Sequence, residues 1–237
     1  MKSRATHLSP RFLIKSFAYS MALACVLAGQ ANADIRLVSD LSGATEPNNT
    51  TFSADVSLSS LTNGNYELTI KLVNTTTSSA VGGYITGFAF STPTGATYVS
   101  GSYQTTNSDF SLLTAPVSTQ PFPSQDLGAA LGGSWTGGGS PNDGIAWSAA
   151  GTNSATFTYD FSGTGLTEDM FKTALIGTSS DPGFLVRFRG LANGQSNKVP
   201  AAAALVPEPT SFALLGIGLT GALLGLRRRR SGNSPAL

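Results

Sequence analysis

The acidic residues between positions 34 and 205 are the first candidates for chemistry in this chain of 237 residues. A glycosidase needs two carboxyl groups that face each other across a sugar, one as the acid and the other as the base or nucleophile. Glu168 and Asp169 are adjacent, but two acids also suit the positive first turn of a helix. No spacing selects a pair among Asp40, Glu46, Asp55, Glu67, Asp109, Asp126, Asp143, Asp160, Glu168, Asp169 and Asp181.

Histidine and cysteine are nearly absent from the chain, which removes several classes of active site. The single histidine is His7 and the single cysteine is Cys25, so both precede residue 34. A chain that begins at Asp34 would therefore lack Ser-His-Asp and Cys-His catalysis and any zinc site built on these residues. Asn142 and Asp143 could offer oxygen atoms to calcium, but Asn-Asp-Gly is also an ordinary turn. We expect no catalytic residue, no metal and no cofactor.

The charge distribution argues against a nucleic-acid partner. Residues 34–205 contain twelve acidic and six basic residues, a formal charge of −6. Binding to phosphates requires clustered Lys or Arg, and the basic clusters of this chain lie instead at its two ends. We therefore expect the region between the ends to bind no nucleic acid.

Three aromatic residues are candidates for contact with a glycan. Residues 114–143 are so rich in Pro and Gly that we expect a long surface excursion there and not regular strands. Phe122 and Trp135 from this segment, together with Trp147, could stack on a sugar ring. The alternative is that these aromatic side chains fold back and cover the domain, since large aromatic side chains contribute much of the buried area of cores.

Alternating apolar and polar residues indicate that β-strands position these side chains. The stretches TFSADVSL and YELTIKL alternate with period two, and Asn63-Gly64 between them favours a tight antiparallel hairpin. Further strands are expected in YITGFAF, ATYVSGSY, GIAWSA, SATFTYDF and GFLVRFRG. In the last of these, Phe184, Val186 and Phe188 alternate with Leu185, Arg187 and Arg189. About seven short strands separated by turn residues predict an all-β, antiparallel β-sandwich or jelly roll.

One short helix is expected inside this β-rich region. In GLTEDMFKTALIG, Thr167 can cap the first turn, Glu168 and Asp169 suit its positive end, and Gly177 can terminate it. The pattern predicts a helix that connects two late strands.

Residues 1–33 have the pattern of a secretory signal peptide. Four basic residues end at Lys15, the apolar stretch SFAYSMALACVLAG follows, and Ala31 and Ala33 fit a small-residue cleavage site. We expect signal peptidase to leave a mature chain that begins at Asp34. The alternatives are an uncleaved anchor, for which the apolar run is short, and lipidation at Cys25, which has Ala22 where a lipobox has Leu.

Residues 206–230 form a second hydrophobic signal. Seventeen residues without charge, 210–226, would extend about 25 Å as a helix, close to the thickness of a bilayer core. The four arginines that follow should stay on the cytoplasmic side of the inner membrane, with residues 34–205 outside and 231–237 as a short cytoplasmic tail. This topology agrees with the signal peptide. The arginines are Arg227, Arg228, Arg229 and Arg230.

The order of these parts resembles the PEP-CTERM sorting signal of Gram-negative bacteria. The signature is carried by Val206, Pro207, Glu208 and Pro209, followed by a Gly- and Leu-rich span and the arginines. The resemblance implies recognition by an exosortase, cleavage near Pro-Glu-Pro and delivery to the cell surface or the extracellular matrix. It also implies an association with exopolysaccharide and biofilm, because members of this class commonly accompany their production.

Two hypotheses of function follow. The first is a non-enzymatic surface or matrix protein that is exported, anchored in the membrane before processing and then associated with exopolysaccharide. The alternative is a secreted carbohydrate-active enzyme that uses paired carboxylates. A pair of carboxylates lining a groove would favour the enzyme, whereas an aromatic patch would favour binding.

Overall fold

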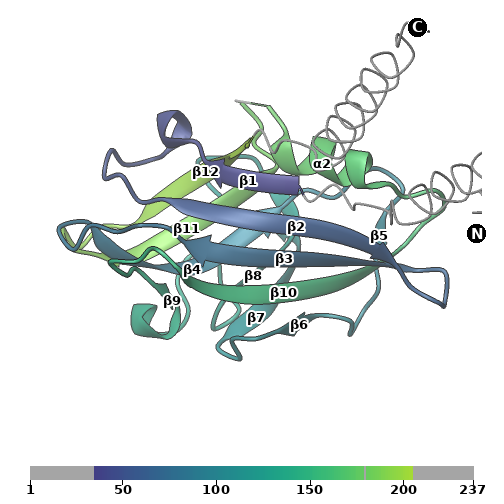
Figure 1. The fold of residues 1–237 in the computed structure, drawn as a ribbon, viewed down its shortest axis with the longest axis horizontal. Coiled ribbons are helices and arrows are strands. Elements are labelled where there is room, and N and C mark those ends of the chain that lie inside the picture. The colour runs from purple at the N-terminus through teal and green to yellow at the C-terminus, as the bar shows by residue number, and fades with distance from the viewer. Residues whose placement is uncertain (1–34, 179, 205–237) are drawn as a thin grey trace, which may run out of the picture. The chain divides into compact units, whose positions relative to one another are not determined.

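The computed structural model describes residues 35–178 and 180–204, and these belong to one compact unit (Figure 1). Besides strands, this part contains the helix α2 (Glu168–Ile176) and two 3₁₀ turns, η1 (Leu41–Gly43) and η2 (Pro141–Asp143). The strands are β1 (Ile35–Ser39), β2 (Phe52–Ser60), β3 (Tyr66–Asn74), β4 (Gly82–Phe90), β5 (Thr97–Tyr98), β6 (Gln104–Thr105), β7 (Phe110–Val117), β8 (Gln125–Leu131), β9 (Ile145–Ala146), β10 (Asn153–Ser162), β11 (Phe184–Leu191) and β12 (Asn197–Ala203).

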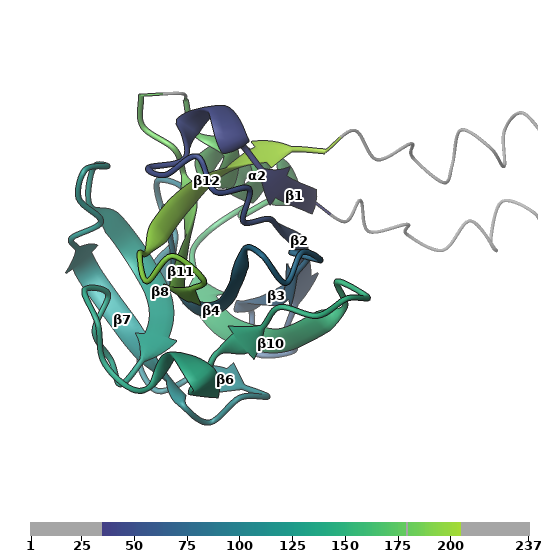
Figure 2. The same cartoon turned by 90° about the vertical axis from the view of Figure 1, so that its left-hand side faces the viewer.

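All strand pairs in this part of the chain are antiparallel, and they form one sheet that curls onto itself. Its order is β5-β10-β3-β2-β1-β12-β11-β4-β8-β7, with β6 on β10 and β9 on β4. β12 lies at the bend, because Asn197–Pro200 pair with β11 whereas Ala201–Ala203 pair with β1. Figure 2 shows the strands wrapped around a common interior. The prediction of an all-β antiparallel fold with one short helix is thus confirmed, with a curled sheet providing the two facing layers.

Aromatic side chains from both layers fill the interior. Phe88 of β4 lies 4.6 Å from Phe157 of β10 between ring centroids, and Phe90 contacts Tyr159 edge-on at 5.2 Å. All four side chains are fully buried. Aromatic pairs at such distances add to the large apolar area that each ring buries. The period-two positions of β4 and β10 therefore form the core that joins the layers.

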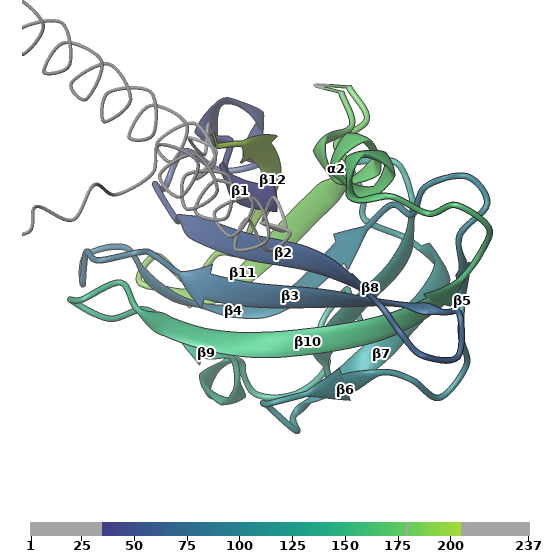
Figure 3. The same ribbon diagram turned by 45° about the vertical axis from the view of Figure 1, so that its right-hand side comes forward.

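The predicted hairpin and helix are both confirmed. β2 and β3 pair in register from Phe52↔Asn74 to Ser60↔Tyr66, and Gly64 in the turn has φ 82°. The Thr167 side chain accepts a hydrogen bond from Met170 N at the start of α2, and Gly177 caps its end. Figure 3 shows α2 beside the end of the curled sheet. Phe171 and Leu175 are its fully buried residues and belong to the main core.

The prediction that residues 114–143 contain no regular strand is wrong. Part of this segment belongs to β7 and β8, and β8 lies between β4 and β7. A Cβ atom on Gly128 would lie 2.2 Å from the Phe88 carbonyl oxygen, so only glycine permits this close approach to β4. The small residues that seemed unsuited to a strand are needed there because the backbones lie so close. β1 and β12 were also not expected. For β12 the reason is its composition, because a proline and three alanines have weak strand propensity.

Candidate functional site

The two ends of the described domain lie side by side in the sheet. β1 pairs with the last three residues of β12, and Ala204 N donates a hydrogen bond of 2.8 Å to Arg36 O. Only Leu205 and Val206 separate Ala204 from Pro207 in the sequence. The expected sorting motif therefore follows a paired strand with almost no linker. Val206, Pro207, Glu208 and Pro209, the signal cleavage residues Ala31, Ala33 and Asp34, and the arginines Arg227, Arg228, Arg229 and Arg230 all lie outside the described residues.

Two of the three candidate aromatic residues meet on the outer face of the sheet. Trp135 is only 5% exposed and packs in a small apolar cluster with Leu185 of β11 and Ala89 of β4. Phe122 is partly buried against the same cluster. We call this group the outer cluster; its remaining members are Leu113, Val117 and Ala130. The Trp135 ring thus covers the outside of the sheet, and stacking on a sugar would require that ring to leave its contacts.

Trp147 lies apart from this group. It follows β9, its backbone N donates to Gly83 O at 2.9 Å, and its side chain is half-buried. Contact between a glycan and Phe122 or Trp147 stays a prediction, as neither ring is fully enclosed.

Three basic side chains gather beside the outer cluster, and we call Arg187, Arg189 and Lys198 the cation cluster. Arg187 and Lys198 are directly opposite each other on β11 and β12. Arg187 Nη1 donates to Trp135 O, and Arg189 Nη1 donates to Gly138 O at 3.0 Å. Lys198 Nζ donates to Gln120 O. The cations thus hold two surface loops against the sheet through backbone carbonyls.

The two guanidinium groups of the cation cluster converge on Gly137. A Cβ atom at this position would lie 3.7 Å from Arg189 Cζ and 3.8 Å from Arg187 Nη1. Both distances are ordinary van der Waals contacts, so the two guanidinium groups lie close together beside the Gly137 backbone. Arg187 Nε is buried and has no hydrogen-bond partner among the described residues.

Burial and like charge act together on these side chains. Burial lowers the pKa of the Arg187 guanidinium, and the positive charge of Arg189 lowers it further. Burial also lowers the pKa of the Lys198 ammonium, with an added contribution from Arg187. Across residues 35–178 and 180–204 the one ion pair within 4 Å joins Arg36 to Asp55, so no carboxylate in those ranges neutralises the cation cluster.

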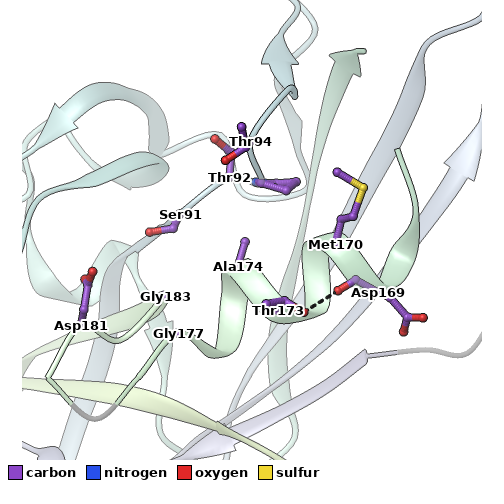
Figure 4. Close-up of a pocket in the computed structure, with 11 residues that line it drawn as sticks. Ser91, Thr92, Thr94, Asp169, Met170, Thr173, Ala174, Gly177, Asp181 and Gly183 are labelled. Carbon is purple, nitrogen blue, oxygen red and sulfur yellow. Dashed lines mark hydrogen bonds between the residues drawn. The ribbon is translucent and has the colours of Figure 1, made fainter. Parts of the chain in front are cut away.

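A pocket of about 590 Å³ lies between α2 and the segment that follows β4 (Figure 4). Two carboxylates, Asp169 and Asp181, line it, but Figure 4 shows them at opposite ends and not pointing toward one another. Its hydroxyl groups are largely occupied, since Thr92 Oγ1 bonds to Asp126 and Thr173 Oγ1 donates to Asp169 O. The pocket thus brings together two predicted carboxylates without the facing arrangement that glycoside hydrolysis uses.

Neither a metal cluster nor a membrane-spanning helix occurs in the part of the chain that the structure describes. No group of three or more His, Cys, Asp or Glu side chains could hold a metal within residues 35–178 and 180–204. No helix in those ranges is long and apolar enough to cross a membrane. The expected hydrophobic helix of residues 210–226 falls outside them.

Sequence reasoning identified only part of the cation cluster as outward-facing. The alternation in β11 places Arg187 and Arg189 on the face opposite Phe184, Val186 and Phe188. Lys198 gave no such signal, because β12 itself was not expected. The convergence with Gly137 depends on a loop that is 50 residues away in sequence, and no local pattern reveals it.

Residues 205–230 match the family model of the PEP-CTERM protein-sorting motif. No match was found among the curated proteins or among the solved structures. The matched motif includes Val206 to Pro209 and the four arginines, as the resemblance in the sequence implied. Such a motif implies export and processing by an exosortase. The chain is therefore a PEP-CTERM domain-containing protein, with its sorting motif at residues 205–230.

Proposed function

We propose that this protein is a non-enzymatic component of the cell surface or extracellular matrix that associates with exopolysaccharide after exosortase processing. The sorting motif at residues 205–230 is the observation that carries this proposal. The position of the motif supports it, because cleavage next to β12 would release the folded domain with little additional chain. Signal peptidase would act first, near Ala33, and the inner membrane would hold the protein until the second cleavage.

Intact mass spectrometry of the protein from its native cell surface and medium tests the processing step. We expect a mature chain that begins at Asp34 and ends near Pro207 to Pro209. A triple variant with Pro207→Ala, Glu208→Ala and Pro209→Ala should keep the arginines and remain in the membrane fraction. Pro47→Ala, a change at an exposed proline before β2, is the matched control and should be processed normally. If the mature wild-type protein kept its arginines, the proposal of a released matrix protein would be wrong, and the protein would be tethered to the membrane.

Incubation of the exported protein with the polysaccharide of its own host tests the non-enzymatic part. We expect the protein to sediment with the polymer and to release no reducing sugar. Asp169→Asn and Asp181→Asn are the variants to compare, because these carboxylates line the pocket beside α2. Sugar release that either substitution abolishes would establish the carbohydrate-active enzyme instead.

A further inference from the structure

We propose that the cation cluster, Arg187, Arg189 and Lys198, binds carboxylate groups of an acidic polysaccharide. This inference rests on the proposed association with exopolysaccharide and names the chemical class that the domain would recognise. It assigns binding to the outer face of β11 and β12 and not to the pocket beside α2.

The cation cluster carries positive charge that no nearby carboxylate compensates. Residues 35–204 contain six basic residues, and three of them lie in the cation cluster. Arg187 and Lys198 are directly opposite in the sheet, an arrangement that is destabilising for like charges. Their acceptors are backbone carbonyls, which carry no net charge, and no carboxylate of the described residues lies within ion-pair distance of them. A bound anion would remove this repulsion.

Several nitrogen donors of the cation cluster have no hydrogen-bond acceptor among the described residues. Arg189 uses Nη1 for the loop carbonyls, which leaves Nε and Nη2 without an acceptor in the part of the chain that is described. Arg187 likewise uses Nη1 for Trp135 O and keeps Nη2 without an acceptor there. A guanidinium presents its donors in a planar fork that matches the two oxygens of a carboxylate. The cation cluster therefore offers directional donors as well as charge.

The two guanidinium groups of the cation cluster also lie close together beside Gly137. A Cβ atom on Gly137 would lie at ordinary van der Waals distance, 3.7–3.8 Å, from both groups. Two guanidinium groups that lie this close together can both approach one carboxylate.

The neighbouring aromatic residue favours a sugar acid over other anions. Phe122 packs on the outer cluster, and the loop that carries it is bonded to Lys198 through Gln120 O. A sugar acid combines an apolar ring face, which suits an aromatic side chain, with a carboxylate. Sequences that bind anionic lipid typically cluster about 4–8 Lys or Arg residues, more than the three here. Nucleic acid is disfavoured by the eleven acidic residues among positions 35–204.

Binding of the exported, processed protein to polygalacturonate, which carries a carboxylate on each sugar, tests the proposal. Dextran serves as the neutral polymer, and phosphatidylglycerol vesicles and duplex DNA serve as the other anions. We expect binding to polygalacturonate that weakens as salt is added, with little binding to dextran, vesicles or DNA. Equal binding to dextran, or preferential binding to vesicles or DNA, would overturn the assignment.

The composition of the domain supplies a charge-matched control. The test variant combines Arg187→Gln, Arg189→Gln and Lys198→Gln, and the control combines Arg36→Gln, Lys71→Gln and Lys172→Gln. Each removes three positive charges, so the two variants share one net charge. We expect the test variant to bind polygalacturonate at least about tenfold more weakly, because it loses the charged donors that would bond to the carboxylates. The control variant should bind polygalacturonate with an affinity near that of wild type. If both variants bound equally weakly, net charge alone would explain the binding and the assignment to the cation cluster would be wrong.

The test variant also loses the hydrogen bonds that hold two loops to the sheet, which could unfold it. A second variant therefore keeps the positive charges as loop donors. Arg187→Lys with Arg189→Lys keeps both charges but removes the planar forks. We expect it to fold, to retain the salt dependence and to bind with an intermediate affinity. Binding identical to wild type in a folded double variant would refute the role of the guanidinium forks.

Two different results distinguish a failure of the carboxylate-binding proposal from a failure of the proposed matrix function. If the wild-type protein is processed and sediments with its host polysaccharide but ignores polygalacturonate, the matrix role stands and the carboxylate assignment fails. If the protein sediments with no host polysaccharide at all, the proposed function fails first.

Discussion

β11 presents two faces that the chain stabilises by different means. On the inner face, Phe184, Val186 and Phe188 are fully buried among aromatic residues from both layers of the sheet. On the outer face, Leu185 packs in the smaller outer cluster, and Arg187 and Arg189 bond to carbonyls of a glycine-rich loop. Apolar packing between strands sets the inner face, whereas polar anchoring of loops sets the outer one. The inner face therefore carries most of the stability, whereas the outer face holds the cation cluster for which binding is proposed.

The largest effect should come from truncating the inner face. Phe184→Ala removes a ring that lies 5.7 Å from Phe88 and 6.0 Å from Phe52 between centroids. We expect a loss of about 3–5 kcal/mol in the free energy of unfolding, because the facing strands cannot close the cavity. Urea denaturation followed by tryptophan fluorescence measures this change. A loss below about 1 kcal/mol would mean that the aromatic core is loosely packed.

The neighbouring residue on the outer face should matter less. Leu185→Ala creates its cavity beneath Trp135 and Phe122, which are carried by loops that can settle inward. We expect a loss of about 2 kcal/mol, near the lower end for a buried leucine. The same denaturation experiment compares the two variants directly. If Leu185→Ala were as damaging as Phe184→Ala, the distinction between the faces would disappear.

The helix α2 offers a smaller test of the inner face, which it covers through Phe171 and Leu175. Thr167→Ala removes the oxygen that accepts from Met170 N and should cost about 1 kcal/mol. Thr173→Ala is the control, because this exposed hydroxyl donates to Asp169 O within the helix and its loss should be nearly neutral. Chemical denaturation should rank Thr167→Ala below wild type and leave Thr173→Ala unchanged. The reverse ranking would show that the cap is not what starts the helix.

An effect of similar size at neutral pH should come from a tyrosine at the edge of the inner core, and this effect should change with pH. Tyr103 donates to Phe110 O at 3.1 Å, so Tyr103→Phe should cost about 0.5–1.5 kcal/mol at pH 7. Burial raises the pKa of Tyr103 from 10.0 to about 12, so the neutral phenol is favoured by the folded state. Wild-type stability should therefore be intact below pH 10 and fall as pH rises toward about 12.

Tyr103→Phe lacks this ionisation, so its deficit relative to wild type should shrink over the same interval. Unfolding curves at several alkaline pH values measure the gap between the two proteins. A gap that stays constant from pH 8 to pH 12 would show that Tyr103 ionises equally in the folded and unfolded chains.

The parts of the fold that the sequence predicted are those with a local signal. The alternation in β2, β3, β10 and β11, the Asn63-Gly64 turn and the capped helix each lie within a short window. β8 was not predicted because glycine has low strand propensity. The missing side chain of Gly128 is needed only because the backbone of β4 lies so close to it, and the local sequence does not show that contact. The same holds for β12, whose alanines and proline have weak strand propensity but find partners in β1 and β11.

The candidate sites also differ in whether a local sequence pattern is sufficient to identify them. The sorting motif is a continuous stretch, so the order of its residues is sufficient to recognise it. The aromatic residues Phe122 and Trp135 were identified by type, but their burial in the outer cluster depends on contacts with β4, β8 and β11.

The sequence by itself determined the sorting of this protein and the class of its fold, because a contiguous motif and a period-two pattern are properties of neighbouring residues. Only the tertiary structure decided which cations meet. Arg187 and Arg189 lie about 50 residues from the loop they bind, and Lys198 reaches them through strand pairing alone. Pairing between distant segments is set by how the whole sheet curls and packs, so no short stretch of sequence contains it.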